Sequence, residues 1–236
     1  MVTIKKQARL AGLLYLLLGV TAPIGLLYVP GKLMVPDNAA ATIENIRNSP
    51  SLLRLGIAFE LIHQVIAVFV ALELYRLFRP VSVRLARQLV VFGCLLSVPI
   101  VFMNILNEVA ALILLSGADY LSAFTTPQLD GLAYTLTRVH ARGLDVAAIF
   151  WGLWLFPFGL LVIKSEFIPH VLGYLLLIAG GAYVVNSFTA LCAPHYLDAV
   201  GKITGILYFC EPPIMLWLLI WGARGPRANE PLPATS

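Results

Sequence analysis

Ionisable and amide side chains inside apolar stretches are the residues of this sequence that could do chemistry. Glu60 and His63 lie within the apolar stretch 52–77, and Asn104 and Glu108 lie within 89–115. Each pair is three or four residues apart, so its members share one face of a helix. A carboxylate beside an imidazole can transfer protons or bind a metal ion. The spacing predicts two polar helix faces in apolar surroundings.

A third stripe of charged residues follows in the stretch 132–163. Arg138, Arg142 and Asp145 are spaced four and three residues apart and therefore share one helix face. His140 lies about 200° around the helix from Arg138, roughly opposite the stripe. Because charge at the centre of a bilayer costs at least about 2.5–3.5 kcal/mol per residue, we expect the stripe to face the protein interior.

The polar residues inside apolar stretches fall mostly in one half of the expected membrane slab, the half away from the basic segment ends. We therefore predict a polar cavity or buried network there, on the extracytoplasmic side. Its candidate binding residues are Glu60, His63, Asn104, Glu108, Arg138, His140, Arg142, Asp145, Asn186 and Glu211.

The candidate set carries more acidic than basic side chains. Four carboxyl groups face only two arginines. Balance could come from protonated His63 or His140, from Lys202, from protonation of a carboxyl group, or from a bound cation.

A metal site is one interpretation of the histidines. Glu60, His63 and His140 could together ligate an ion, because histidine and carboxylate suit zinc. The sequence contains no HExxH, P-loop, GxGxxG, CxxC or nucleophile-elbow motif. It therefore predicts no metal and no cofactor, and the catalytic residues of any reaction are unknown.

Composition excludes a soluble globular protein. The 236 residues are 60% apolar and 12% charged, with a mean hydropathy of +0.89, against roughly 45–50% apolar and about 25% charged in soluble domains. The net charge of +4 comes from Lys and Arg at segment ends, so it does not indicate nucleic acid. Three cysteines without CxxC spacing indicate free thiols.

Six segments are long enough to cross about 30 Å of hydrocarbon. They are 10–29, 52–77, 89–115, 132–163, 170–192 and 203–223. The first is too long for a signal-peptide core, so we expect a retained helix. A short helix over 39–48, capped by Asp37 or Asn38, should follow it.

These segments predict an all-α transmembrane bundle of about six helices in a single domain, residues 1–223, followed by a disordered cytoplasmic tail, 224–236. Ten Lys and Arg lie on one side of the predicted membrane and four on the other. The positive-inside rule then puts both termini in the cytoplasm.

Several blocks carry a family resemblance over nearly the whole chain. They include ARLAGLLYLL at 8–17, VPDNAAATIENI at 35–46, ALELYRLFRPVSVRLA at 71–86, and HARGLDVAAIFWGLWLFPFGLLVIKSEFIPHVLGYLLLIAGGAYVVNSF at 140–188. The chain resembles the bacterial multi-pass membrane proteins of domain of unknown function 4386. The resemblance implies the fold and a bacterial inner (cell) membrane but no activity, and it points to His140, Asp145 and Glu211. Pro212–Pro213 departs from the family pattern.

Three functions remain open from the sequence. The first is binding or transport of a small polar or cationic ligand, or a lipid headgroup, in the outer polar cavity. The second is a structural or accessory role in the membrane. The third is a membrane-embedded enzyme, with or without a metal. The expected partners are the lipid bilayer and a small polar ligand or cation, with no nucleic acid.

Overall fold

A computed structural model describes residues 4–223, which form helices joined by short connections and contain no strand. The helices that cover the bundle are α1 (Ile4–Pro23), α2 (Val29–Leu33), α3 (Ala39–Asn48), α4 (Pro50–Phe78), α5 (Val83–Val90), α6 (Ser97–Leu114), α7 (Thr126–Leu153), α8 (Leu155–Lys164), α9 (His170–Cys192), α10 (Leu197–Leu207) and α11 (Pro212–Ile220). Short π-helical turns at Ile24–Tyr28 and Val91–Leu96 join α1 to α2 and α5 to α6.

Within the described residues, six helical segments are long and apolar enough to cross a membrane, which confirms the predicted number. They are Ile4–Leu33, Pro50–Phe78, Val83–Leu114, Thr126–Lys164, His170–Cys192 and Pro194–Ile220. The fifth has the predicted bounds, and the others begin before the predicted apolar stretches because polar first turns also adopt helix.

Side-chain caps set several of these ends. Asn38 Oδ1 accepts the Ala41 N–H at 2.9 Å, so α3 begins where the sequence predicted. Thr125 and Gln128 form a capping box at the start of α7, six residues before the apolar stretch begins. Sequence hydropathy alone therefore underestimated the length of the fourth span.

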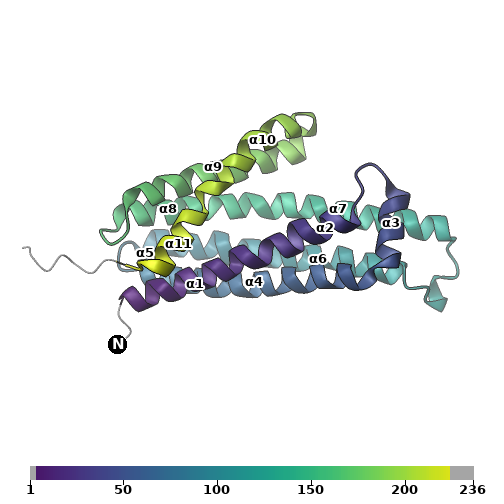
Figure 1. Ribbon diagram of the computed structural model, residues 1–236, viewed down its shortest axis with the longest axis horizontal. Helices are drawn as coiled ribbons and strands as arrows, with labels where there is room; N and C mark the ends of the chain where they lie inside the picture. The colour runs from purple at the N-terminus through teal and green to yellow at the C-terminus, as the bar shows by residue number, and fades with distance from the viewer. Residues whose placement is uncertain (1–3, 224–236) are drawn as a thin grey trace, which may run out of the picture.

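The helices run along one long axis, and the two ends of the described chain meet at the same end of it (Figure 1). Arg9 Nη2 donates to the Ile220 carbonyl at 2.8 Å, which joins the first helix to the last. We call this the termini end and the opposite end, which carries α3, the distal end. Which side of a membrane each end faces stays a prediction, and the predicted tail 224–236 lies outside the described residues.

Two pairs of glycines bring α7 and α8 against α9. A Cβ atom on Gly152 would lie 2.7 Å from the Gly180 carbonyl oxygen, and one on Gly159 would lie 2.7 Å from the Gly173 carbonyl oxygen. The reverse contacts are as close. Small residues at matching positions allow such backbone contact between membrane helices.

The last span is bent. Pro212 and Pro213 lack backbone N–H groups, so the helix cannot continue through them, and a 3-10 turn at Tyr208–Cys210 separates α10 from α11. The α11 half packs on α1, whereas the α10 half packs on α9. In Figure 1, α10 accordingly diverges from α1 and α2 toward the distal end.

Candidate functional site

Three buried ionisable residues from three helices meet in the distal half of the bundle. His140 Nε2 on α7 lies 3.3 Å from Glu60 Oε1 on α4 and 3.7 Å from Glu108 Oε1 on α6. The side chains are 2–6% exposed. One ligand atom from each residue lies within 4.8 Å of the other two. We call Glu60, Glu108 and His140 the distal triad.

Asn104 on α6 orients the histidine. Its Nδ2 donates to the His140 carbonyl oxygen at 2.8 Å, and its own carbonyl oxygen lies 3.3 Å from His140 Nδ1. When Nδ1 carries the proton and donates to that carbonyl, Nε2 is left as a bare acceptor facing two carboxylates. A metal-binding histidine usually donates a hydrogen bond from its other ring nitrogen, here Nδ1, to a carbonyl or carboxylate oxygen.

Gly143 makes this arrangement possible. A Cβ atom at this position would lie 2.0 Å from Asn104 Oδ1 and 2.4 Å from its Cγ. Only a residue without a side chain lets α7 approach the amide so closely. Gly25 plays a smaller part at Glu60, where a Cβ would lie 3.0 Å from the glutamate Cγ.

The triad has unmet bonding capacity. His140 Nε2, Glu60 Oε2 and Glu108 Oε2 are buried and have no hydrogen-bond partner. Within residues 4–223, the only ion pairs of Glu60 and Glu108 are with His140, which is charged only when protonated. Buried polar atoms are nearly always paired, so three unpaired ones within one cluster of side chains indicate a missing cation or proton.

The triad lies far along the helices from the termini end. At 1.5 Å per residue, about 36 Å of helix separate His140 from Lys164, and about 27 Å separate Glu60 from Phe78. The hydrocarbon core is about 30 Å thick. If those basic helix ends mark one membrane surface, the triad lies close to the other.

The arginine stripe lies apart from the triad, so the prediction of one cavity that holds both the stripe and the two glutamates was wrong. Arg138 is exposed. Arg142 pairs with Asp145 at 3.0 Å and lies 3.4 Å from the Ala190 carbonyl oxygen of α9. The helix turns the stripe toward α9, and His140, on the opposite face, reaches the glutamates instead. The periodicity located both faces, but it could not determine which of them meets α4 and α6.

Two further predicted residues also lie apart from the triad. His63 Nδ1 contacts the Leu18 carbonyl oxygen at 3.2 Å and Thr21 Oγ1 at 3.3 Å, on the side facing α1. Asn186 accepts a hydrogen bond from Thr204 Oγ1 at 3.1 Å, which links α9 to α10. The residues predicted to form one cavity therefore occupy several places, and their binding roles stay predictions.

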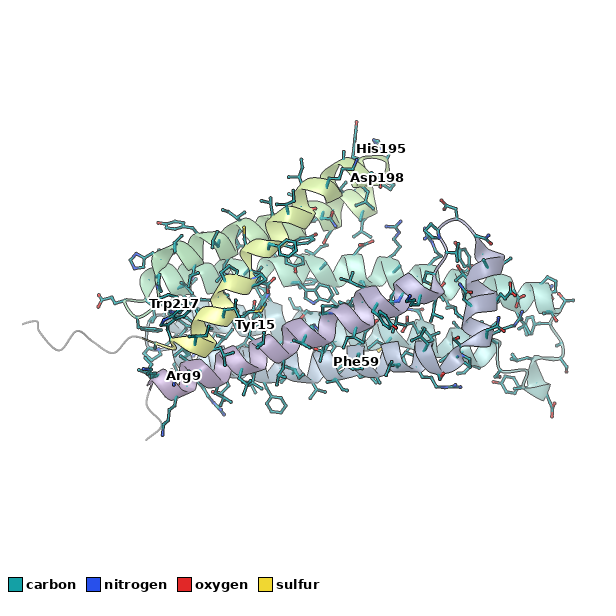
Figure 2. The ribbon with its side chains drawn as sticks, viewed as in Figure 1. Arg9, Tyr15, Phe59, His195, Asp198 and Trp217 are labelled. Carbon is teal, nitrogen blue, oxygen red and sulfur yellow. The ribbon has the colours of Figure 1, made fainter. Side chains whose placement is uncertain are left out.

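Glu211 has different partners from those expected. From its depth in the sixth apolar segment, the sequence favoured a contact with Arg142 or His140, directly or through water, whereas the hydrogen bonds of Glu211 go to tyrosines. Tyr15 OH of α1 instead donates to Glu211 Oε1, and Tyr183 of α9 lies beside the same carboxyl group. Figure 2 shows Tyr15 close to where the last span crosses α1. Glu211 directly follows the 3-10 turn at Tyr208–Cys210, so it lies at the bend of the last span.

Sequence reasoning missed the tyrosines because a tyrosine in an apolar helix is not unusual. The one available signal was position. Tyr15 lies about 16 Å of helix from Ile4, too deep for an interfacial aromatic residue. A buried phenol needs a partner for its hydroxyl group.

The fold and the buried ionisable groups define an integral multi-pass α-helical membrane protein. The chain belongs to the family described as Domain of unknown function (DUF4386), whose model matches residues 10–222, so the resemblance seen in the sequence is confirmed. An uncharacterized protein of Archaeoglobus fulgidus is 29% identical over 160 residues, covering 68% of this chain and 79% of the relative. No solved structure matches the chain.

Proposed function

We propose that this protein binds a divalent transition-metal ion at Glu60, Glu108 and His140. The observation that carries the proposal is the cluster of three buried side chains from three helices, each of which keeps one buried ligand atom without a hydrogen-bond partner. A bound cation is one way to balance the excess of carboxyl groups seen in the sequence, and under this proposal that cation is a divalent transition-metal ion.

The distances support a metal ion. Ligand atoms bound at about 2.1 Å to a tetrahedral ion lie about 3.4 Å from each other. The separations from Nε2 to the two carboxylate oxygens, 3.3 and 3.7 Å, are close to that value. Small side-chain rotations would complete the geometry.

The charge also fits. Two carboxylates with a neutral imidazole carry a charge of −2, which a divalent ion cancels. A proton on His140 would cancel only half of it. Because burying uncompensated charge costs several kcal/mol per ion, the divalent state is the better balanced one.

The donor set limits the choice of ion. One imidazole and two carboxylates suit zinc, and harder ions such as manganese(II) accept the same ligands. Three protein ligands leave a fourth position for water. Neither the cavity beside Glu211 nor the smaller one beside Arg47 is lined by Glu60, Glu108 or His140.

The multi-pass location in a membrane follows from the six apolar spans. We place the protein in the cell membrane, in bacteria the inner membrane, with both termini cytoplasmic and the triad toward the outer surface. The archaeal relative is consistent with a cell membrane in either kind of organism. The excess of Lys and Arg on the termini side supports this orientation.

Metal analysis of purified protein tests the proposal. The protein in detergent is stripped with EDTA, reloaded separately with Zn²⁺, Mn²⁺ or Co²⁺, and desalted. We expect one tightly held ion per chain, a raised unfolding temperature, and Co²⁺ visible absorption of a four- or five-coordinate site. Glu108→Gln keeps the side-chain volume and should lose the ion.

Glu73→Gln is the matched control. Glu73 lies at the termini end, where its side chain, 13% exposed, pairs at 2.5 Å with the exposed Arg76. This variant should bind metal as the wild type does. If wild-type protein holds none of the three ions after reloading, the proposal fails, and a loss of stability in Glu108→Gln would then indicate a proton-sharing structural network.

A further inference from the structure

A cavity of about 380 Å³ lies between α1, α4, α7, α9 and the bend of the last span, separate from the distal triad. Most of its wall is apolar. Its polar side chains are Tyr15, His63, Gln64, Ser97, Tyr183, Tyr208 and Glu211. We call it the Glu211 cavity.

Glu211 is the only carboxyl group among the residues that line this cavity, and no Lys or Arg lines it. Within residues 4–223, Glu211 forms no ion pair, and its hydrogen-bond donors are the hydroxyl groups of Tyr15 and Tyr183. Tyrosine hydroxyl groups solvate a carboxylate without cancelling its charge. An ionised side chain inside a membrane span is costly and normally meets a counter-charge. A cationic ligand would supply one here.

Aromatic rings add a second feature that suits a cation. The rings of Tyr183 and Tyr208 stack with centroids 4.3 Å apart, and Trp154 meets Tyr15 edge to face at 5.5 Å. Both pairs line the cavity. Aromatic faces attract cations, most strongly where water is excluded, and they also pack against an apolar ligand body.

The bend gives the cavity a route to the bilayer. Because α10 packs on α9 while α11 packs on α1, the last span leaves α1 at the level of Glu211. Leu27 and Pro212 line the cavity and are also exposed, Leu27 to 69%. The cavity therefore reaches the exposed surface between the π-helical turn that follows α1 and the last span, on the side that lipid covers.

We propose that the Glu211 cavity binds a lipophilic organic cation, an amine or onium group on an apolar body, that enters from the bilayer. Glu211 is its counter-charge, the tyrosine rings surround the cationic centre, and the apolar wall holds the body. This goes beyond the metal site proposed above and does not depend on it.

Two probes of the same shape and opposite charge test the inference. Tetraphenylphosphonium and tetraphenylborate are titrated into protein in nanodiscs while tryptophan fluorescence is recorded, with empty nanodiscs subtracted. Trp151 and Trp154 line the cavity and should report occupancy. We expect Glu211→Gln to lower the ratio of cation affinity to anion affinity at least tenfold relative to the wild type. Comparing ratios cancels the different membrane partitioning of the two probes.

Glu73→Gln, which alters a carboxyl group outside the cavity, should leave the ratio unchanged. EDTA treatment should also leave it unchanged, so failure of the metal proposal would not affect this result. Tyr208→Phe provides a second variant that keeps the charge, and it should retain the cation preference. An unchanged ratio in Glu211→Gln, or wild-type protein that quenches with neither probe, would overturn the inference.

Discussion

Replacing Gly143 by alanine puts one methyl group into the contact that positions His140. The new Cβ would lie 2.0 Å from Asn104 Oδ1, so the amide must move. Displacement of the amide would lengthen or break the 2.8 Å hydrogen bond from Asn104 Nδ2 to the His140 carbonyl oxygen. The substitution therefore tests whether the tight approach of α6 and α7 builds the distal triad.

The expected effect combines three contributions. Overpacking costs about 1–3 kcal/mol, and a lost hydrogen bond costs about 0.5–1.5 kcal/mol. Alanine stabilises a helix interior by about 0.5–1 kcal/mol relative to glycine. The sum is a net destabilisation of about 2 kcal/mol, or about 4–8 °C in unfolding temperature for a chain of this size. Metal retention should fall as well, because His140 shifts with its support.

Gly131→Ala is the matched control in the same helix. A Cβ at Gly131 would meet nothing within 4 Å, so only the helix-propensity gain remains and the unfolding temperature should rise slightly. Thermal unfolding in detergent measures both variants. Asn104→Ala combined with Gly143→Ala removes the clashing atoms, so the double variant should be less destabilised than the two single effects added together. If Gly143→Ala is as stable as Gly131→Ala, the contact does not constrain the triad.

Three further outcomes follow from the same structure. Arg142→Ala should change stability by less than about 1 kcal/mol, because its pair with Asp145 is partly exposed, at 44% and 26%; a loss above 2 kcal/mol in denaturant titration would contradict this. Gly180→Ala should lower the unfolding temperature, since its Cβ would meet a backbone oxygen at 2.8 Å, whereas Gly181→Ala, with nothing within 4 Å, should not. Reporter fusions after the last span and within 116–131 should show opposite sides of the membrane, and equal readings would refute the topology.

The spans were predictable from the sequence because hydropathy over twenty residues is a local property. The short helix α3 was predictable as well, since its cap is a neighbour in the chain. The bend in the last span was only partly predictable. Pro212–Pro213 indicated an interruption, but whether the helix merely kinked or opened onto a cavity depended on α1 and α9.

For the candidate site, the polar faces of single helices were predictable from the sequence, but the contacts between those faces were not. Spacing put Glu60 and Glu108 on polar faces and put His140 opposite the arginine stripe. Which face of α7 meets α4 and α6 depends on packing between distant segments, in particular on Gly143 against Asn104. No local sequence pattern indicates that contact. The sequence therefore predicted that the charged stripe would face the glutamates, whereas in the structure His140 does.

The contact between the first and last helices has a consequence for biogenesis. Gly12 of α1 lies against the backbone of Leu219, where a Cβ would be 2.3 Å from the nitrogen atom. Tyr15, one turn further on, donates to Glu211. A ribosome releases α1 into the membrane long before α11 exists, so this face of α1 must wait without its partner until translation is nearly complete. The interface between α1 and α11 is therefore the last part of the bundle to form. A chain truncated before the sixth span would leave this face of α1 exposed in the membrane, where quality-control proteases can recognise it.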